Sequence, residues 1–367
     1  MGAIGVAQIV HSLDVGGMER VTMHLCLRMS SRYRPTVFCL TEKGRFADEL
    51  EARGVEVIAL GKQPGKDLRL PGRLARLLRE REIRIVHGHN SGPLFTGTLA
   101  AKLARAKGVI ITDHSRPFPE RFSVVAAEFV LSRLVDEIVS VSDQNKKDLL
   151  QHLHWPARKI SVIHNGVDEA PPATDDQLAA LRTEFDLSPS RPVVFVAARL
   201  EPQKNIALLI EAARVLRTHG LDADYLVAGG GSEQARLEKL VVETGMRDRF
   251  HLAGWRLDTA QLLRAADIFA LPSDWEGLPM SILEAMSASR PVVATDVGDV
   301  HRAVVNEQTG LLVPPRDVRQ LADALARLLA DPALRERLGA AGHALWREKF
   351  SVEKMVARYE ELYARYA

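Results

Sequence analysis

Two adjacent glycines followed by a carboxylate stand near the start of the chain. Gly16 and Gly17 come after the apolar run Ile4–Val10 and before a helix that is expected to begin near Glu19. Consecutive glycines let the backbone approach an anion closely, and a helix N-terminus supplies unpaired N–H groups and the positive end of a dipole. A phosphate would fit such a loop. The alternative is a plain tight turn, in which Glu19 only complements the helix dipole.

Two cations follow a later apolar run in the segment VVFVAARLEPQKNI. Arg199 comes just after the expected strand, and Lys204 lies at the mouth of the next helix. A planar guanidinium and a mobile ammonium could together clamp a diphosphate. Cations in such loops are often only solvated, but the position at the carboxyl end of a strand favours a binding role.

Two carboxylates, Glu276 and Glu284, flank the start of another expected helix. That helix is expected to begin around Pro279 or Met280, since proline is tolerated in a first helical turn. Glu276 then lies in the preceding loop and Glu284 about one turn inside the helix. Ionised carboxylates accept hydrogen bonds from sugar hydroxyls, and backbone amides around Gly277 could meet a phosphate. For a single glutamate, simple dipole complementarity is the alternative.

Three histidines also lie at expected strand ends. His114, in ITDHSRP, follows an expected strand, where an active-site role is favoured over a structural one. His87 and His89, in VHGHN, have the spacing of a metal-binding pair, but no nearby carboxylate or cysteine completes a site. We interpret them as strand-end packing residues or as residues on the acceptor side.

Short β-branched apolar runs alternate with amphipathic helical patterns, which predicts parallel sheets covered on both faces and hence the α/β class. The expected strands are Ile4–Val10, Thr36–Leu40, Val55–Leu60, Ile83–Val86, Val109–Thr112, Glu137–Val141, Ile160–Ile163, Val193–Ala198, Ala223–Ala228, Arg249–Leu252, Ile268–Leu271, Pro291–Ala294 and Leu311–Val313. The acidic, proline-containing segment 165–176 interrupts the series and is expected to be a hinge. Two Rossmann-like domains facing a cleft are therefore predicted, with an all-helical pattern from Val318 onward and a last helix over 351–367.

The composition of the 367 residues excludes several classes of protein. Lys plus Arg number 49 and Asp plus Glu 47, a balance that argues against a dedicated nucleic-acid binder. The apolar and charged fractions exclude disordered, collagen-like and coiled-coil chains. Residues 1–170 hold 25 Lys and Arg against 19 Asp and Glu, whereas the remainder holds 24 against 28. The basic excess therefore belongs to the N-terminal half.

The compartment is expected to be reducing and cytosolic. Cys26 and Cys39 match no disulfide framework or zinc pattern. The N-terminal residues lack the basic and long apolar regions of a signal peptide, and no stretch reaches the roughly 20 apolar residues that span a bilayer. A cytoplasmic protein, or one that is peripheral on the inner face of the membrane, is the expectation.

Taken in order, the motifs resemble those of retaining glycosyltransferase family 4, also called glycosyl transferases group 1, whose members have the two-domain GT-B architecture. The resemblance covers essentially the whole chain. The segments that carry it are Gly16-Gly17-x-Glu19, Asn165–Asp168, Arg199-x4-Lys204, Gly229–Gly231, Glu276-x7-Glu284 and Thr309–Val313.

The resemblance implies roles for particular residues. The residues implied in catalysis are His114, Arg199, Lys204 and Glu276. The residues implied in binding the nucleotide sugar are Gly16, Gly17, Arg199, Lys204, Gly229, Arg256, Leu257, Glu276, Gly277, Leu278, Pro279 and Glu284. The two cations would neutralise the leaving diphosphate. Glu276 would hold the transferred sugar and Glu284 the ribose, while the backbone at Arg256 would meet the base.

The resemblance also implies a reaction and a division of labour between domains. Residues 1–166, with the C-terminal helix 351–367, would form the acceptor domain, and 167–350 the donor domain. A hexosyl unit would move from a nucleotide-diphosphate sugar, with UDP favoured, to a glycan or lipid-linked acceptor in surface polysaccharide or glycolipid synthesis. Retention by same-face attack without a divalent metal or other cofactor is implied. Nothing in the sequence itself singles out a carboxylate for double displacement.

Three residues depart from the family pattern. Ala198 stands where a glycine is usual, Gly230 where an acidic residue is common, and Ser232 where proline is usual. These departures bear on which base is held. The alternatives to transfer are a storage-glucan or sucrose-type synthase, a sugar-nucleotide epimerase on a related scaffold, and an inactive nucleotide-sugar-binding or scaffolding subunit. The intact Arg–Lys and Glu–Glu pairs favour transfer.

Contact with a membrane is the open question on the acceptor side. Leu70–Arg84 is a basic helical stretch with leucines on one face, and Phe118–Val135 is apolar. Such a stretch could rest on an anionic membrane surface. We favour a crossover helix that packs its leucines onto the sheet.

Overall fold

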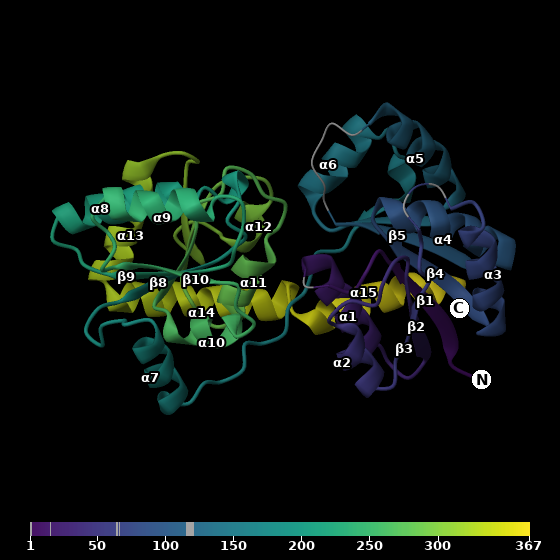
Figure 1. The fold of residues 1–367 in the computed structure, drawn as a ribbon, viewed down its shortest axis with the longest axis horizontal. Coiled ribbons are helices and arrows are strands. Elements are labelled where there is room, and N and C mark those ends of the chain that lie inside the picture. Colours follow the sequence, from purple (N-terminus) through teal and green to yellow (C-terminus); the bar gives the residue numbers. More distant parts are fainter. Residues whose placement is uncertain (1, 15, 64, 66, 115–120) are drawn as a thin grey trace. The chain divides into compact units, whose positions relative to one another are not determined.

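The protein forms two compact units in a computed structural model, which describes residues 2–14, 16–63, 65, 67–114 and 121–367. Unit 1 comprises Met1–Gly166 and Val352–Ala367, and unit 2 comprises Val167–Ser351. Each unit is an open parallel sheet with helices on both faces (Figure 1).

The described residues of unit 1 form a seven-stranded sheet in the order β3-β2-β1-β4-β5-β6-β7. The strands are β1 (Ile4–Val10), β2 (Tyr33–Cys39), β3 (Glu56–Ala59), β4 (Ile83–His89), β5 (Gly108–Asp113), β6 (Glu137–Ser140) and β7 (Ile160–Val162). In the register of the central strands, Val10 lies beside Cys39 of β2, and Ile9 lies beside Gly88 of β4. The order of the strands therefore reverses between β1 and β4.

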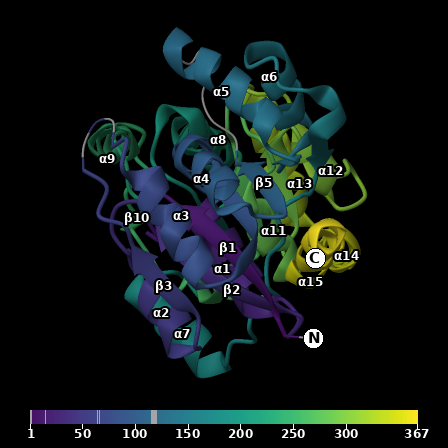
Figure 2. The same cartoon turned by 90° about the vertical axis from the view of Figure 1, so that its right-hand side faces the viewer.

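Helices cover both faces of this sheet. They are α1 (Gly17–Arg28), α2 (Ala47–Ala52), α3 (Leu70–Glu80), α4 (Ser91–Ala104), α5 (Phe122–Leu134), α6 (Asp143–His152) and α15 (Val352–Tyr363). Ile9 packs on the side of α3 to α6, whereas Val10 faces α1 and α2. This alternation follows from the period of two along a strand. Figure 2 shows α3 and α4 next to each other over the sheet.

The described residues of unit 2 form a six-stranded parallel sheet in the order β10-β9-β8-β11-β12-β13. The strands are β8 (Val193–Ala197), β9 (Asp224–Ala228), β10 (Phe250–Gly254), β11 (Ile268–Leu271), β12 (Val292–Thr295) and β13 (Gly310–Val313). The order reverses between β8 and β11, as it does between β1 and β4 in unit 1.

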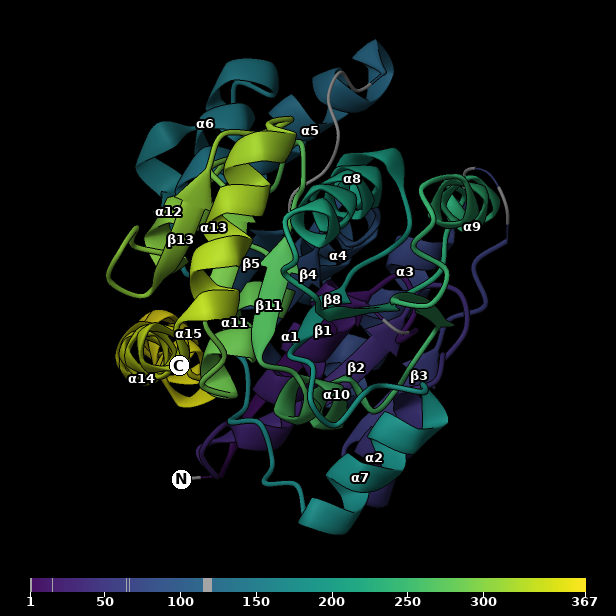
Figure 3. The same ribbon diagram turned by 90° about the vertical axis from the view of Figure 1, so that its left-hand side faces the viewer.

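The helices of unit 2 also form two layers (Figure 3). They are α7 (Asp175–Glu184), α8 (Ile206–Thr218), α9 (Gln234–Glu243), α10 (Thr259–Ala265), α11 (Met280–Ser287), α12 (Val300–Ala303), α13 (Val318–Ala330) and α14 (Pro332–Lys349). Helices α8, α9 and α13 share one core with residues such as Val194, and α7, α10, α11 and α12 share the other with Phe195. Thr174 begins α7 with a capping box, in which its side chain and that of Gln177 each accept a hydrogen bond from the other's backbone N–H.

The predicted fold class is confirmed. All the expected strands are present, two Rossmann-like sheets are formed, and the last helix, α15, belongs to unit 1 as expected for a chain that crosses back. Some boundaries differ by two or three residues from the prediction. Helix α1 begins at Gly17 rather than near Glu19, β2 begins at Tyr33 rather than Thr36, and β4 ends at His89 rather than Val86. In the part of the chain that the structure describes, no helix is both long enough and apolar enough to cross a membrane.

Candidate active site

Three of the predicted residues of unit 2 lie on loops that start where its strand order reverses. In open α/β sheets, ligands bind beyond the carboxyl ends of the strands at such a switch point. The loop after β8 carries Arg199 and Lys204, and the loop after β11, the neighbouring strand, carries Glu276. The topology of the sheet thus brings the cations and the carboxylate to one edge.

Lys204 and Glu276 form an ion pair although 72 positions separate them in the chain. Lys204 Nζ donates to Glu276 Oε1 over 2.5 Å, and Ser273 Oγ donates to the same oxygen over 2.6 Å. The two side chains are only 14% and 6% exposed, whereas Arg199 is exposed. An ammonium has three donors and a carboxylate two oxygens, so both groups keep capacity for a ligand.

Further hydrogen bonds tie the two loops together. Gln203 Nε2 donates to the carbonyl of Trp275, and the N–H of Asp274 donates to the carbonyl of Gln203, each over 2.8 Å. Asn205 Nδ2 donates to Asp274 Oδ1 over 2.9 Å, and Arg316 Nη2 donates to Asp274 Oδ2 over 2.9 Å. These hydrogen bonds fix the two loops against each other. The Lys204–Glu276 pair is therefore in position before any ligand binds, as preorganised electrostatic groups are.

The second carboxylate lies inside the expected helix. Helix α11 begins at Met280 with Pro279 as its N-cap, and Glu284 is a half-buried residue of its second turn. Leu278 packs its side chain into the core of unit 2, so only its backbone could reach a ligand. Pro279 has no N–H, which leaves Gly277, Leu278 and Met280 as amide donors of this stretch.

The glycines after β9 allow a close approach of two backbones. A Cβ on Gly229, which has a φ of +147°, would lie 1.9 Å from the carbonyl oxygen of Ala198, and one on Gly231 would lie 2.4 Å from that of Leu200. The N–H of Leu200 donates to the carbonyl of Gly230 over 3.0 Å. The loop that carries Arg199 therefore rests on the glycine loop. The alanine at 198 is tolerated because its carbonyl, not its side chain, faces Gly229.

In the region predicted to meet the base, carboxylates hold the side chain of Arg256. Arg256 Nε donates to Asp258 Oδ1 over 2.8 Å, and Arg256 Nη1 donates to Glu184 Oε1 over 2.5 Å. These hydrogen bonds raise the pKa of Arg256 further above its ordinary value. Leu257 is 80% exposed. A Cβ on Gly230 would lie 2.5 Å from Trp255 Nε1, so the indole occupies the space that a larger residue would need.

In unit 1, the paired glycines form the start of α1. Gly16 is the N-cap in an extended conformation, and Gly17 is the first helical residue. A Cβ on Gly16 would lie 2.3 Å from Glu19 Oε2, so the carboxylate of the first turn folds back over this glycine. Burial raises the pKa of Glu19. A side chain at position 16 would therefore displace the Glu19 carboxylate from its place over the helix N-terminus.

His114 follows β5 and begins a chain of buried hydrogen bonds. Its Nε2 lies 2.9 Å from His89 Nδ1, and His89 Nε2 lies 2.9 Å from Gln8 Oε1. Gln8 Nε2 then donates to the Tyr363 hydroxyl of α15 over 3.0 Å. The N–H of His114 donates to Asn90 Oδ1 over 2.8 Å. His87 and His89 lie inside β4 rather than at its exit, because the strand extends through His89.

The hydrogen-bond network continues to a third histidine, His87. The Tyr363 hydroxyl lies 2.6 Å from His87 Nδ1, and His87 Nε2 lies 2.7 Å from Thr112 Oγ1. Thr112 Oγ1 lies 3.1 Å from the hydroxyl of Tyr359, also on α15. Burial lowers the pKa of His87 to about 3 and that of His114 to about 4, so both are neutral at pH 7.

The direction of these bonds assigns a tautomer to each ring. Since Gln8 Oε1 can only accept, His89 carries its proton on Nε2 and accepts at Nδ1. His114 must then donate from Nε2, which leaves its Nδ1 as a lone pair. Among the described residues, His114 Nδ1 is buried and has no hydrogen-bond partner. The network therefore presents a neutral imidazole with a free acceptor.

Sequence reasoning missed several of these partners. Ser273 on Glu276, Gln8 on His89, and both tyrosines of α15 were not identified in advance. Gln8 could have been predicted to have a partner. It is the only polar side chain of the run Ile4–Val10, and a buried polar group needs a hydrogen-bond partner. The contacts of the two tyrosines could not be predicted, because Tyr359 and Tyr363 lie more than 240 positions from Thr112 and His87.

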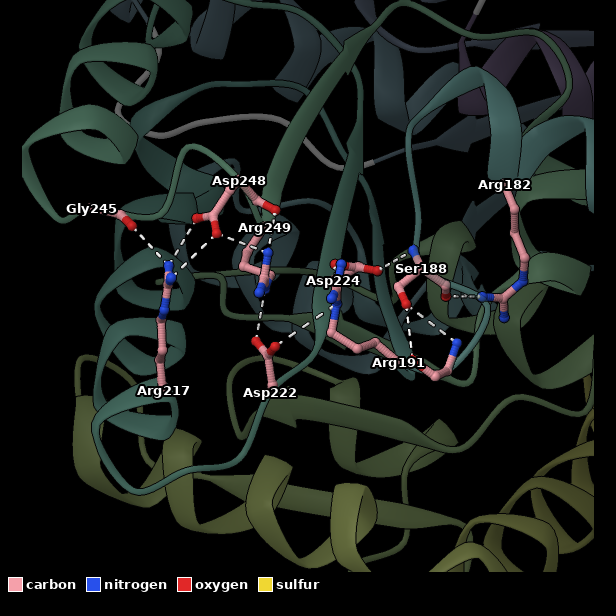
Figure 4. Close-up of polar contacts among 10 residues, drawn as sticks. Arg182, Ser188, Arg191, Arg217, Asp222, Asp224, Gly245, Asp248 and Arg249 are labelled. Atoms are coloured by element: carbon pink, nitrogen blue, oxygen red, sulfur yellow. Dashed lines mark hydrogen bonds and ion pairs between the residues drawn. The ribbon is translucent and has the colours of Figure 1, made fainter.

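Another group of charged residues lies at the opposite edge of the unit 2 sheet, around the amino ends of β8, β9 and β10 (Figure 4). Arg191 Nε donates to the buried Asp224 over 2.9 Å, and Arg217 Nη1 donates to Asp248 over 2.8 Å. Arg249 also takes part. Because ligands of these sheets bind at the carboxyl ends, we interpret this group as cross-links between loops. Separately, within the described ranges no three His, Cys, Asp or Glu residues are grouped so as to hold a metal ion.

Two family models match the chain, one in each unit. "Glycosyltransferase Family 4" matches residues 15–170, and "Glycosyl transferases group 1" matches residues 179–344. The UDP-Gal:alpha-D-GlcNAc-diphosphoundecaprenol alpha-1,3-galactosyltransferase of Escherichia coli is 31% identical over 73% of this chain and 72% of its own length. The GDP-mannose-dependent alpha-(1-6)-phosphatidylinositol monomannoside mannosyltransferase of Mycobacterium tuberculosis is 31% identical over 87% of both chains.

Solved structures share the fold of the whole chain. A glycosyltransferase from Rickettsia africae superposes with a TM-score of 0.89 at 20% identity, covering 100% of this chain and 99% of its own. Anabaena HepE, solved with UDP, gives 0.85 at 22% identity, covering 99% and 100%. The two sheets, each with its switch point, have the GT-B architecture of these structures, and the matched family models and relatives are glycosyltransferases. The chain belongs to glycosyltransferase family 4.

Proposed function

We propose that the protein transfers a hexosyl unit from a nucleotide-diphosphate sugar to a glycan or lipid-linked acceptor, with retention of anomeric configuration. The observation that carries this proposal is the Lys204–Glu276 pair at the switch point of unit 2, with Arg199 on the same loop. A cation for a departing diphosphate and a carboxylate for sugar hydroxyls are needed side by side in such a reaction.

The chemistry of the donor follows from these groups. As the glycosidic bond breaks, negative charge develops on the diphosphate, and Lys204 and Arg199 stabilise it. Glu276 accepts hydrogen bonds from the sugar, and Glu284 accepts them from the ribose. With two cations in place, no divalent metal is required. Retention follows from attack of the acceptor on the face that the diphosphate leaves.

Unit 1 supplies further proposed contacts. Gly16 and Gly17 would meet the diphosphate, and His114 would meet the sugar. The buried Nδ1 lone pair of His114 suits a hydroxyl donor, because a neutral imidazole with one committed N–H can only accept at its other nitrogen.

The names of the relatives support the choice of substrates. The E. coli relative uses UDP-galactose and HepE was solved with UDP, whereas the M. tuberculosis relative uses GDP-mannose. Both enzymes act on lipid-linked acceptors. We therefore propose UDP as the nucleotide, and glycolipid or surface polysaccharide synthesis as the process.

The test is a thermal-shift panel of UDP-, GDP- and ADP-sugars, followed by turnover with the donor that binds. A ligand at 100 times its Kd stabilises the folded state by about 2.7 kcal/mol. NMR of the product should show the anomeric configuration of the donor, and turnover should persist in EDTA. Binding of no nucleotide sugar would contradict the function, and an inverted product would contradict retention.

A further inference from the structure

One face of α4 in unit 1 forms a wall of a cavity of about 910 Å³. The other side is formed by Leu68, Pro71 and Gly72, at and before the first turn of α3, which packs beside α4 (Figures 1 and 2). Spacings of three and four place the lining residues of α4 on one helical face. Those residues are Gly92, Phe95, Thr96, Leu99, Lys102 and Leu103.

The cavity is apolar and uncovered. Leu68 is 88% exposed, Leu99 43% and Leu103 57%. Single exposed leucines are ordinary, but three around one cavity of ligand size indicate a binding site for an apolar group.

One end of the cavity lies at the carboxyl edge of the sheet, close to His114. The N–H of Lys62 donates to the carbonyl of Leu40 over 2.8 Å, and a Cβ on Gly92 would lie 3.4 Å from Leu40 Cδ1. Lys62 and Gly92 therefore mark the same end. Two residues before Gly92, Asn90 accepts the backbone N–H of His114.

Lys62 places an ammonium at this end of the cavity. Among the described residues, the ammonium of Lys62 donates only to the backbone carbonyls of Gln63 and Gly65, so no carboxylate neutralises it there. The nearby carboxylate of Asp67 accepts the N–H of Leu70 at the start of α3. Helix α4 adds the positive end of its dipole. An anionic group is therefore favoured beside Lys62.

We infer that this cavity binds the hydrocarbon chain of a phosphate-linked lipid acceptor. Its phosphate lies at Lys62, and its chain follows α4 from Gly92 toward Leu103, a length of about 16 Å at 1.5 Å per residue. The reacting sugar then lies on the His114 side. This inference rests on the proposed function and narrows its acceptor to the lipid-linked class.

The first experiment measures binding without turnover. Dodecyl phosphate, below its micelle concentration, is titrated calorimetrically into the full-length protein, with inorganic phosphate as the headgroup probe. Leu99→Glu places a charge in the apolar wall. It should lower the affinity for dodecyl phosphate at least tenfold, about the effect of a mismatched group in an apolar pocket. Lys62→Ala should weaken it as well. Val242→Glu, at an exposed apolar position on α9 of unit 2, is the matched control and should bind dodecyl phosphate like wild type.

The second experiment measures turnover with two acceptors that share a sugar-diphosphate head but carry either a long polyprenyl chain or a methyl group. Leu99→Glu should lower kcat/KM at least tenfold for the long-chain acceptor and leave the methyl acceptor unchanged. If wild type binds no nucleotide sugar, the proposed function fails. If nucleotide sugar binds but Leu99→Glu behaves like Val242→Glu with dodecyl phosphate, only the cavity assignment fails.

A third arm separates a single chain from a membrane surface. Vesicles of neutral lipid and of neutral plus anionic lipid are sedimented with the protein in the absence of acceptor. Binding to anionic vesicles without any binding of dodecyl phosphate would overturn the inference in favour of surface adhesion.

Discussion

At the scale of single residues, Lys204 and Glu276 hold each other in position for a ligand. The pair is nearly buried, and Ser273 supports the carboxylate. Breaking a buried pair leaves one charge without its partner, which costs more than a surface ion pair contributes. The same two side chains therefore contribute to stability and to the proposed chemistry, and the two effects must be measured separately.

Replacing Lys204 by alanine should lower kcat by about 10²–10³, the usual effect of removing one transition-state charge stabiliser. The folded state should also lose stability, because Glu276 then keeps only its hydroxyl partner. Steady-state kinetics with saturating donor and thermal unfolding report the two effects. Arg217→Ala, in the charged group at the opposite sheet edge, is the control and should keep wild-type kcat. Equal kcat in Lys204→Ala and wild type would exclude Lys204 from the chemistry.

The buried histidines of unit 1 predict acid sensitivity. Burial lowers the pKa of His87 to about 3 and of His114 to about 4, from an ordinary value near 6.5. The unfolded chain therefore binds more protons below pH 6.5, so stability is fully present above that pH and falls toward pH 4. For each such histidine, the free energy of unfolding should fall by about 2 kcal/mol between pH 7 and pH 5.

Thermal or urea unfolding at pH 7, 6 and 5 measures this loss. His87→Gln keeps donor and acceptor atoms but cannot charge, so the loss of stability between pH 7 and pH 5 should shrink. A wild-type pH dependence in His87→Gln would show that this histidine does not titrate on unfolding.

The motif residues were recognisable from residue type and position along the chain, but their partners were not. Arg199 and Lys204 follow a strand, so the rule that ligands bind at carboxyl strand ends favoured a binding role for them, whereas the role of Glu276 was implied by the family resemblance. The contact between Lys204 and Glu276 depends on β8 and β11 being neighbours, which local sequence does not encode. The tautomer of His114 depends on Gln8, which lies on β1. In the sheet, β4 separates β1 from β5, the strand that His114 follows.

At the scale of elements, the loops after β8 and β9 are packed so closely that only glycine fits. Gly229→Ala should displace the loop that carries Arg199, because the new Cβ would lie 1.9 Å from the carbonyl oxygen of Ala198. We expect weaker donor binding and a loss of about 1–3 kcal/mol of stability.

Gly220→Ala is the matched control for Gly229→Ala. Gly220 also has a positive φ, of +74°, but a Cβ there would meet no atom within 4 Å. The Gly220→Ala variant should lose stability through backbone strain alone, and its affinity for the donor should be unchanged. Thermal shifts with and without the donor compare the two variants. If both lose the same stability and keep donor affinity, the contact between the loops does not matter for binding.

The strands were predictable because their apolar runs are short, β-branched and bounded by turn residues. The start of α1 was predicted near Glu19, two residues late, although Glu19 does lie in the first turn, as its third residue. Helix boundaries depend on local contacts at the cap, here the return of Glu19 over Gly16. The cavity beside α4 was not predictable either, because it depends on the packing of α3 against α4.

At the scale of the whole molecule, each unit has its own core, but the chain is not divided into two simple halves. After unit 2 ends, α15 returns to unit 1 and places Tyr359 and Tyr363 against β4 and β5. Both tyrosines are fully buried. Unit 1 is thus complete only when the last residues of the chain are present, although unit 2 is continuous in sequence.

Removal of 352–367 should therefore destabilise unit 1 and leave unit 2 able to bind nucleotide sugar. Calorimetry should show one unfolding transition shifted to lower temperature or lost, and the other still raised by the donor. Tyr363→Phe is the milder variant: it leaves Gln8 and His87 without the hydroxyl and should cost about 1–3 kcal/mol, since buried polar groups that lose a partner are expensive. If the truncated chain unfolds like the full-length protein, α15 is not part of the unit 1 core. If it no longer binds the donor while unit 2 stays folded, donor binding depends on more than unit 2.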